Sequence, residues 1–326
     1  MNLPELSDSN VKGKKVLLRL DLDVGVDTSR IESAKETLEF LVENSAKTII
    51  IGHKGRPDGV EEPLSLRPLA KVIGALVGKE VGFAENATIE EGEMVLLENL
   101  RFDSREENND ENFAKELASL GQFFVNEAFA VSHRPHASIV GVPKYLPHAA
   151  GFRFTQEVEN LNKILVNPKR PLVVIISGIK EDKVEMAKSL TQIADMVLVG
   201  GKLPKYFGDT NPSPKKLIIG DLSFDGFDIT LNSAERFKVE IAKAGTIVLA
   251  GVLGKYEDEG HRQGTKEVFE AVAACNAYKI AGGGDTEAAL SLFGLTDKFD
   301  WISVGGGAML DFIVKGTLPG IAALLE

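Results

Sequence analysis

The sequence predicts an α/β protein of two domains, each with a parallel sheet covered by helices on both faces. Three observations support this fold class. Short apolar runs alternate with stretches of helical period along most of the chain. The chain has 326 residues, which is enough for two domains of ordinary size. The alternation is interrupted at Asn167-Pro168-Lys169-Arg170-Pro171, where we expect the domains to be connected.

In the first half of the chain, apolar strands alternate with amphipathic helices. Ser29 is placed to cap the first helix, and Leu69, Val72 and Ile73 share one face of the second. The predicted strands are Lys15–Asp21, Thr48–Ile51, Met94–Leu97 and Phe123–Val125, and the predicted helices are Arg30–Glu43, Leu66–Val77 and Glu111–Leu120.

A predicted helix at Gly151–Leu165 has no strand of its own, so we expect it to connect the domains. The sequence therefore predicts two Rossmann-like three-layer α/β/α domains with parallel sheets, over residues 1–150 and 151–314, the second beginning with this helix. The strands predicted for the second domain are Leu172–Ile176, Met196–Val199, Leu217–Ile219, Thr246–Leu249, Tyr278–Ile280 and Trp301–Val304, and the helices are Lys183–Ile193, Ser233–Ala242, Lys266–Ala274, Thr286–Leu292 and Ala308–Val314.

Composition and charge restrict the possible functions. The net charge of −11 argues against general binding to nucleic acid or anionic membranes, so any anion site must be a local basic pocket. A single cysteine, Cys275, excludes an intramolecular disulfide and a cysteine-cluster metal site. The N-terminus lacks a signal-peptide pattern, and no apolar run approaches the ~20 residues that span a bilayer. We therefore expect a cytoplasmic protein.

Basic side chains follow the strands of the first half. The carboxyl ends of parallel strands meet at one edge of the sheet, where ligands bind in such folds. One cationic loop is more often solvated surface, but repetition at one edge favours a pocket for a small, multiply charged anion. Guanidinium groups suit such an anion because they offer a rigid fork of donors. The side chains at this edge are Arg19, His53, Arg56, Arg101, Arg134 and His136, and Arg30 opens the helix after the first strand.

The strand ends of the second half carry glycine instead. Glycine lets backbone N–H groups approach a ligand closely, and a following helix N-terminus attracts phosphate. A single such turn is ordinary, whereas five at one edge favour a nucleotide site. The turns are Ser177-Gly178, Gly200-Gly201, Ala250-Gly251, Gly282-Gly283-Gly284 and Gly305-Gly306-Gly307.

The glycine turns of the second half do not match the two common phosphate-binding motifs. The chain contains neither a Walker A loop nor a dinucleotide-binding Gly-x-Gly-x-x-Gly between a strand and a helix. Asp285 directly follows three glycines and precedes a helix. It could hold Mg²⁺ against a phosphate chain or could simply cap the helix, and the sequence favours neither.

Taken together, the motifs resemble those of the phosphoglycerate kinase family over nearly the whole chain. The C-terminal Leu318-Pro319-Gly320-Ile321 also fits that family, and implies that residues of about 315–326 fold back on the first domain. The other motifs that carry the resemblance are Arg19-Leu20-Asp21-Leu22-Asp23, His53-Lys54-Gly55-Arg56-Pro57, Leu96 to Phe102, Asn126 to Ser138, Gly282 to Thr286, and Gly305 to Ala308.

The resemblance implies a reversible, magnesium-dependent phosphoryl transfer between 1,3-bisphosphoglycerate and ADP, which gives 3-phosphoglycerate and ATP. We expect a monomer with no nucleic-acid or membrane partner. By motif matching, 3-phosphoglycerate would bind to Arg19, Asp21, Asp23, Arg30, His53, Arg56, Arg101, Arg134 and His136. The nucleotide would bind to Lys180, Lys183, Gly200, Gly201, Glu257, Gly282, Gly283, Gly284, Asp285 and Thr286, with Mg²⁺ on Asp285; catalysis would involve Arg30, Lys180, Gly283 and Gly306.

Departures from the family pattern leave alternatives open. Asp23 replaces an asparagine and Gly25 a proline, while the lysine segment from Ser177 to Lys183 is one residue short. Ala250 and Val252 replace an asparagine and a proline, and the region between Lys202 and Gly245 is shortened. A non-catalytic sensor that keeps the anion pocket is one alternative. A two-domain dehydrogenase is another, disfavoured because the dinucleotide fingerprint is missing.

Overall fold

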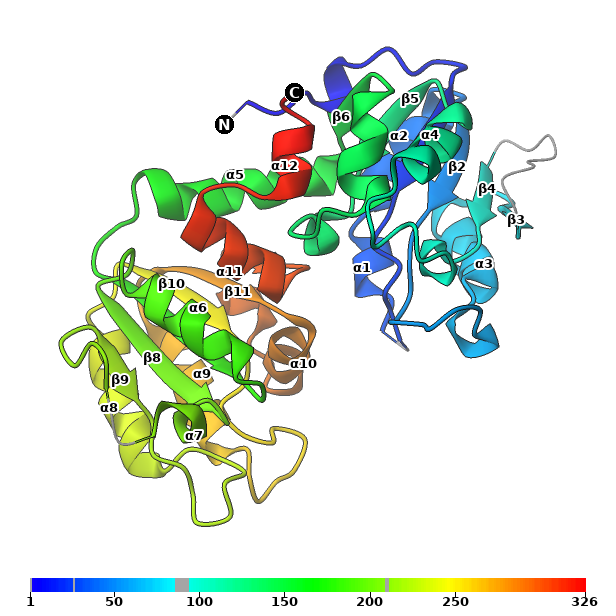
Figure 1. The fold of residues 1–326 in the computed structure, drawn as a ribbon. Coiled ribbons are helices and arrows are strands. Elements are labelled where there is room, and N and C mark those ends of the chain that lie inside the picture. The colour runs from blue at the N-terminus through cyan, green and yellow to red at the C-terminus, as the bar shows by residue number, and fades with distance from the viewer. Residues whose placement is uncertain (1, 26, 86–93, 209–210) are drawn as a thin grey trace. The chain divides into compact units, whose positions relative to one another are not determined.

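The computed structural model describes residues 2–25, 27–85, 94–208 and 211–326, which form two compact units (Figure 1). The first unit comprises Met1–Glu159 and Thr317–Glu326, and the second comprises Asn160–Gly316. Each unit contains a six-stranded sheet, and the strand pairs are parallel. The predicted fold class is therefore confirmed. The boundary between the units falls within helix α5 (Phe152–Val166).

The first sheet has the strand order β3-β4-β2-β1-β5-β6. In the central strand, Arg19 lies in register with Ile51 on one side and with Asn126 on the other. The residues that follow these three positions are therefore neighbours at the carboxyl edge. The strands are β1 (Lys15–Arg19), β2 (Lys47–Ile51), β3 (Gly82–Ala84), β4 (Met94–Leu97), β5 (Phe123–Asn126) and β6 (His148–Ala150).

Both faces of the central part of this sheet are buried, because β1, β2, β4 and β5 carry apolar residues at most positions. Leu18 packs in one core with Leu38 and Ile73, which come from α2 and α3. Its neighbour Leu17 faces the other way and packs with Leu117 of α4. The helices of this unit are α1 (Ser29–Glu32), α2 (Lys35–Glu43), α3 (Arg67–Val77), α4 (Glu111–Ser119) and the C-terminal α12 (Pro319–Ala323).

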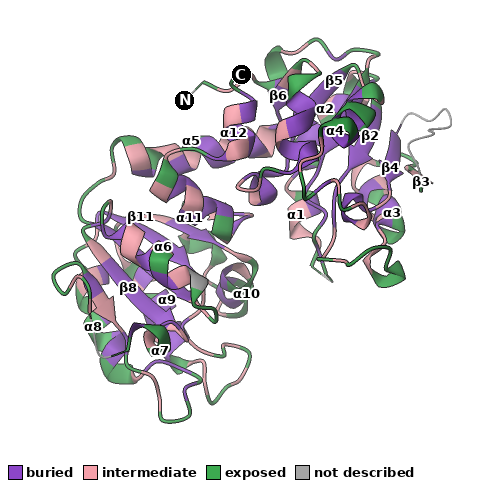
Figure 2. Cartoon of the chain, viewed as in Figure 1, coloured by how far each residue is buried: buried purple, intermediate pink, exposed green. Residues whose placement is uncertain are grey.

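The second sheet has the strand order β12-β11-β10-β7-β8-β9. Its inner strands β7, β8 and β10 are largely buried, whereas the edge strands β9 and β12 are only partly buried (Figure 2). Figure 1 shows α6 on one face with α8 and α9 on the other. The elements are β7 (Leu172–Gly178), α6 (Asp182–Leu190), β8 (Met196–Gly201), α7 (Pro204–Phe207), β9 (Leu217–Ile219), α8 (Leu231–Ile241), β10 (Thr246–Ala250), α9 (Gln263–Ala274), β11 (Tyr278–Gly282), α10 (Gly284–Leu292), β12 (Trp301–Ser303) and α11 (Gly306–Lys315).

The helix expected over Arg30–Glu43 is in fact two helices, α1 and α2. The Ser33 hydroxyl donates to the Arg30 carbonyl at 2.7 Å, a local bond that competes with a continuing helix. The expected cap is also wrong. Ser29 is the first helical residue, and its N–H donates to the Asp27 side chain at 2.8 Å.

Sequence patterns missed four short elements: β3, β6, α7 and α12. The two strands have three residues each and lie at the sheet edges, so neither has an apolar run of usual length. None of the helices in the described ranges is long and apolar enough to cross a membrane.

The C-terminal segment packs on the first unit. Leu318 and Ile321 are fully buried, and the N–H of Gly320 donates to the Ser132 carbonyl at 2.9 Å. A side chain at Gly320 would meet the Ser132 side chain at 2.7 Å. This close approach joins the chain end to the segment that follows β5.

A buried carboxylate ties β5 to the start of α5. Glu127 accepts hydrogen bonds from the Thr37 hydroxyl at 2.6 Å and from the N–H groups of Arg153 and Phe154 at 3.1 and 3.0 Å. These N–H groups belong to the first turn of the helix, where no helical acceptor exists. Burial raises the pKa of Glu127 to about 7, although these hydrogen bonds work in the opposite direction.

The raised pKa predicts a pH-dependent stability. The folded chain holds the Glu127 proton more tightly than the unfolded chain, so the stability from this group falls as the pH rises from about 4.5 to about 7. The loss is on the order of 3 kcal/mol. Glu127→Gln cannot ionise and should lose correspondingly less stability between pH 5 and pH 8.

Thermal unfolding of the variant and the wild type at both pH values measures this difference. The matched control is Glu159→Gln, which removes an exposed carboxylate from α5, the helix whose first turn is bonded to Glu127. Equal pH slopes in Glu127→Gln and the wild type would contradict the prediction.

Candidate functional site

A cluster of arginines and histidines occupies the carboxyl edge of the first sheet. Arg19 ends β1, His53 lies just beyond β2, and Arg101 lies in a short helical turn after β4. Arg134 and His136 lie in the segment that follows β5. The parallel topology therefore gathers side chains that are far apart in the sequence.

Arg19 is completely buried and forms the centre of the cluster. Its Nε donates to the Ser138 hydroxyl at 2.9 Å, and its Nη2 lies 2.9 Å from His53 Nδ1. Its Nη1 donates to the carbonyl of Leu20. Most of its hydrogen-bonding capacity thus holds the protein together at this edge.

A buried glutamate balances this charge. Glu106 accepts from the Ser138 N–H at 2.9 Å and from its hydroxyl at 2.6 Å, and lies 3.8 Å from His136 Nδ1. Burial raises the pKa of Glu106, while Arg19 acts against that rise. Burial lowers the pKa of Arg19, and Glu106 is the main opposing group. The sequence pattern did not single out Glu106, because one glutamate in an acidic stretch has no distinguishing signal.

The two histidines carry no charge at neutral pH, contrary to their expected role as basic groups. Burial and the nearby arginines lower the pKa of His53 well below its usual range. The same causes lower the pKa of His136 to about 3. Positive charge at this edge comes from the arginines, and the histidines offer neutral imidazole groups.

The first strand also brings two aspartates to the cluster. The buried Asp21 Oδ2 lies 3.5 Å from Arg30 Nη1, and burial raises the pKa of Asp21. Asp23 is exposed, and its carboxylate accepts from the Gly55 N–H at 2.9 Å. The Asp23 carbonyl accepts from Arg30 at 3.1 Å. Asp23 thus holds the loop that carries Arg56.

Two arginines of the cluster remain uncommitted. The exposed Arg56 and the half-buried Arg134 make no side-chain hydrogen bond or ion pair with the residues that the structure describes. Arg101 instead donates to the Gly55 carbonyl at 2.6 Å and lies 3.3 Å from Glu107. Arg56 and Arg134 therefore have the greatest capacity to bind an anion.

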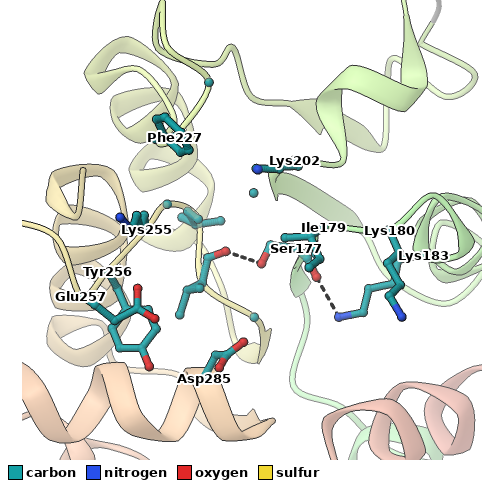
Figure 3. Close-up of a pocket in the computed structure, with 17 residues that line it drawn as sticks. Ser177, Ile179, Lys180, Lys183, Lys202, Phe227, Lys255, Tyr256, Glu257 and Asp285 are labelled. Atoms are coloured by element: carbon teal, nitrogen blue, oxygen red, sulfur yellow. Dashed lines mark hydrogen bonds between the residues drawn. The ribbon is translucent and has the colours of Figure 1, made fainter. Parts of the chain in front are cut away.

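The second unit contains a pocket of about 590 Å³ beside the ends of β7, β8 and β10 (Figure 3). Figure 3 shows Phe227 and Lys202 at one side, Asp285 at another, and Lys180 and Lys183 at a third. The pocket is lined by Ser177, Gly178, Ile179, Lys180, Lys183, Gly201, Lys202, Gly226, Phe227, Gly251, Val252, Leu253, Gly254, Lys255, Tyr256, Glu257 and Asp285.

Two lysines enter this pocket from the segment after β7. The Lys183 amine donates to the Ser177 carbonyl at 2.9 Å, and its side chain crosses Gly178 so closely that a Cβ there would meet it at 2.7 Å. Lys180 is exposed. Its amine makes no hydrogen bond or ion pair within the described ranges. The Lys180 amine is therefore free to meet a ligand.

The glycine triplets allow the starts of α10 and α11 to approach each other. A Cβ on Gly306 would lie 2.9 Å from the Gly282 carbonyl oxygen and from Gly283 Cα. Gly283 has a φ of +106°, which disfavours other residues. Neither helix has a side-chain cap on its first turn. The first N–H groups of both helices can therefore donate hydrogen bonds to an anion.

Other predicted residues hold the walls without lining the pocket. The Thr286 hydroxyl accepts from the Gly251 N–H at 2.8 Å, and a Cβ on Gly200 would collide with Leu253 at 2.3 Å. The residues predicted for this unit's site that are not in the pocket lining are Gly200, Gly282, Gly283, Gly284, Thr286 and Gly306.

The structure adds lining residues that sequence reasoning did not assign. Lys202 directly follows a predicted glycine pair, and Lys255 and Tyr256 directly precede Glu257. Their position beside predicted site residues could have identified these three as lining residues. Phe227 had no such signal, because it lies in an irregular loop between β9 and α8.

Asp285 offers one carboxylate to the pocket. It is exposed at the start of α10, and its side chain makes no hydrogen bond or ion pair among the described residues. Within the same residues, no group of three or more His, Cys, Asp or Glu side chains could hold a metal ion. This donor set fits Mg²⁺, which is commonly held by one or two carboxylates and the phosphates of its ligand.

Comparisons with known proteins agree across the chain. A sequence model of the phosphoglycerate kinase family matches residues 6–215 and 210–316. The phosphoglycerate kinases of Finegoldia magna and Dictyoglomus turgidum are 35% and 36% identical, and the alignments cover 100% and 99% of this chain and 100% and 98% of those proteins. Solved phosphoglycerate kinases from Coxiella burnetii and Pyrococcus horikoshii have TM-scores of 0.83 and 0.85 at 31% and 25% identity, with at least 98% of each chain covered.

The contact between the two helix starts predicts a selective effect of adding one methyl group. Gly306→Ala should destabilise the second unit by about 1–3 kcal/mol, because the new Cβ meets the backbone of Gly282 and Gly283. Gly307→Ala is the matched control, since a Cβ there has nothing within 4 Å. Thermal unfolding of both variants measures the difference, and equal stabilities would contradict the close-approach argument.

Proposed function

The chain belongs to the phosphoglycerate kinase family, and on this premise we propose which of its residues bind the substrates and move the phosphoryl group. The reaction is a reversible phosphoryl transfer with a carboxyl group as acceptor. In one direction the acyl phosphate bond of 1,3-bisphosphoglycerate breaks, an oxygen of the ADP β-phosphate takes up the phosphoryl group, and 3-phosphoglycerate and ATP are formed. The assignments that follow concern single residues of this chain.

We propose that the cluster at the edge of the first sheet binds 3-phosphoglycerate. The observation that supports this is the uncommitted pair Arg56 and Arg134 beside three arginines that are already partly engaged. A doubly charged phosphate and a carboxylate need several donors, and guanidinium groups supply them at fixed geometry. Neutral His53 and His136 would donate hydrogen bonds without adding charge.

The commitment of the arginines predicts two different mutational effects. Arg134→Ala should weaken 3-phosphoglycerate binding by about 1.5–3 kcal/mol, roughly ten- to 150-fold, with little loss of stability. Arg19→Ala should in addition unfold the protein more easily, because it leaves Glu106 buried without its counter-charge. Isothermal titration calorimetry and thermal unfolding measure the two effects separately.

Lys12→Ala is the matched control for lost positive charge, since Lys12 is exposed and precedes β1 at the opposite edge of the sheet. If Arg134→Ala bound 3-phosphoglycerate as tightly as Lys12→Ala does, the assignment of this cluster would be wrong.

We propose that the pocket of the second unit binds the adenine nucleotide. Its volume suits a ligand of this size, and its lining combines apolar walls with lysines and glycine backbone. Gly201 and Phe227 would contact the base, and Glu257 the ribose. The phosphates would lie beyond the pocket lining, at the uncapped starts of α10 and α11. Gly200 supports this wall from behind by making room for Leu253.

Lys180 is the proposed stabiliser of the moving phosphoryl group. Phosphoryl transfer needs positioning and charge neutralisation more than covalent chemistry by the protein. A free lysine amine at the pocket can neutralise charge that develops on the equatorial oxygens. Arg30 would serve the same purpose from the acid substrate's side. Gly283 and Gly306 would contribute by presenting the backbone N–H groups of α10 and α11.

Asp285 is the proposed magnesium ligand, together with phosphate oxygens of the nucleotide. Bound there, Mg²⁺ would neutralise phosphate charge and orient the phosphate chain. The exposed and unpaired carboxylate at the start of α10 supports this assignment. Family membership further supports a cytoplasmic location and a glycolytic role, and light scattering would test the expected monomer.

The roles of the two lysines can be separated kinetically. Lys180→Ala should lower kcat on the order of 10²-fold or more, with little change in affinity for 3-phosphoglycerate. Lys188→Ala is the matched control, because it removes a partly exposed lysine of α6 that pairs with Glu185 and does not line the pocket. The measurement is a coupled assay of ATP-dependent 3-phosphoglycerate phosphorylation.

An inactive wild type in this assay would favour the non-catalytic sensor. An active wild type with an unaffected Lys180→Ala would refute the stabilising role. A drop confined to Lys183→Ala would move that role to Lys183.

The magnesium assignment predicts a shift in metal requirement. Asp285→Asn should raise the Mg²⁺ concentration for half-maximal activity by on the order of ten-fold. It should also weaken Mg–ADP binding while leaving the binding of ADP alone nearly unchanged. Asp297→Asn serves as a control for lost negative charge on an exposed turn. If both variants showed the same magnesium titration, Asp285 would be only a helix-terminal residue.

A further inference from the structure

One histidine of the second unit lies between carboxylates from two different loops. His261 Nε2 is 2.8 Å from Asp225 Oδ2, and His261 Nδ1 is 3.0 Å from Asp258 Oδ2. Asp225 belongs to the loop between β9 and α8, which we call the 221–230 loop. Asp258 and His261 belong to the loop between β10 and α9, the 251–262 loop. The imidazole therefore bridges two segments that are separate in the sequence.

The geometry requires a protonated imidazole. An ionised carboxylate only accepts hydrogen bonds, so both ring nitrogens must donate, and only the imidazolium has two N–H groups. In agreement, the hydrogen bonds with Asp258 and Asp225 raise the pKa of His261 above its usual 6.5. Hydrogen bonds from Ser223, Phe227 and His261 lower the pKa of Asp225 to about 2. The two carboxylates therefore favour the charged imidazole that the bridge needs.

The bridge is joined directly to the pocket wall. The other oxygen of Asp225 accepts from the Phe227 N–H at 3.0 Å, and the Phe227 carbonyl accepts from the Lys255 N–H at 2.9 Å. The rings of Phe227 and His261 meet edge to face, with centroids 5.3 Å apart. Both Phe227 and Lys255 line the pocket. A change in the bridge would therefore reach the wall through one residue.

Other charged groups near His261 are accounted for. Lys255 Nζ lies 3.7 Å from Asp258 Oδ2, and Arg262 pairs with Glu259 at 2.8 Å. The buried Asp228 accepts from the N–H groups of Ile229 and Gly264. Burial raises the pKa of Asp228, and these hydrogen bonds and His261 act against that rise. Asp258 thus pairs with two cations, Lys255 and His261. Within the described ranges, Asp225 pairs with His261 only.

We propose that His261 is a positioning residue for the nucleotide, whose imidazolium joins the 221–230 and 251–262 loops and thereby holds Phe227 and Lys255 in the pocket wall. The proposal rests on the assignment of this pocket to the nucleotide. When the pH rises past the raised pKa, one ring nitrogen loses its proton and faces a carboxylate oxygen as a second acceptor. The loops then lose one ionic hydrogen bond, so nucleotide affinity falls at alkaline pH.

Calorimetric titration with ADP at fixed Mg²⁺, from pH 7 to pH 9.5, tests this bridge. Wild-type affinity should fall about three- to ten-fold over this range, because partly exposed ion pairs are weak. His261→Gln should bind ADP more weakly at pH 7 by the same factor and show little further pH dependence. Phe224→Ala is the matched control, since Phe224 is fully exposed on the same loop and does not line the pocket.

A second variant keeps the test decisive if His261→Gln folds poorly. Asp225→Asn preserves the shape of the side chain but removes one of the two charges that retain the proton, so the fall in ADP affinity should move to lower pH. Equal pH profiles in the wild type and both variants would overturn the proposal. Affinity for 3-phosphoglycerate should be unchanged throughout, and a wild type that did not bind ADP at all would instead refute the nucleotide assignment.

Discussion

The buried guanidinium of Arg19 is the constraint on which the first unit's site depends. A charge removed from water is costly unless it is paired and hydrogen-bonded. Arg19 meets this requirement with Ser138, His53 and the carboxylate of Glu106. Segments that follow β2, β4 and β5 must therefore converge on the end of β1. The positions of the uncommitted Arg56 and Arg134 follow from this convergence, because both lie in segments that it brings together.

The proposed phosphate site of the second unit relies more on glycine backbone and helix starts than on arginines. Glycines at the strand ends allow backbone segments to approach closely, as at Gly306 and Gly283. Helix starts without side-chain caps then present N–H groups, and only a few lysines are added. The lining contains four lysines and two acidic side chains, so part of its side-chain charge is compensated. We thus expect the first unit to bind its ligand mainly through guanidinium groups, and the second to combine lysines with backbone N–H groups.

Local hydrogen bonds hold one wall of the second unit's pocket in a chain that is shorter than its relatives. The alignment with the Finegoldia magna enzyme is 394 residues long and covers both proteins fully, whereas this chain has 326 residues, so the relative contains segments that are missing here. The two family matches overlap at 210–215, within the region between Lys202 and Gly245 that the sequence comparison with the family pattern predicts to be shortened. The nearby 221–230 loop still reaches the pocket, because its Asp225 is bonded to His261 and its Phe227 to Lys255. Local hydrogen bonds here hold the wall in place.

The sequence by itself determined the fold class and most of the helices and strands, because alternating apolar runs and helical periods are local properties. It also identified the residues at the strand ends, since parallel topology places them at one edge. Tertiary structure alone decided their chemical states. Burial, and then the arginines that folding brings around them, lowers the pKa of His53 and of His136. Glu106 and His261 acquire their roles only through partners that folding brings within hydrogen-bonding distance.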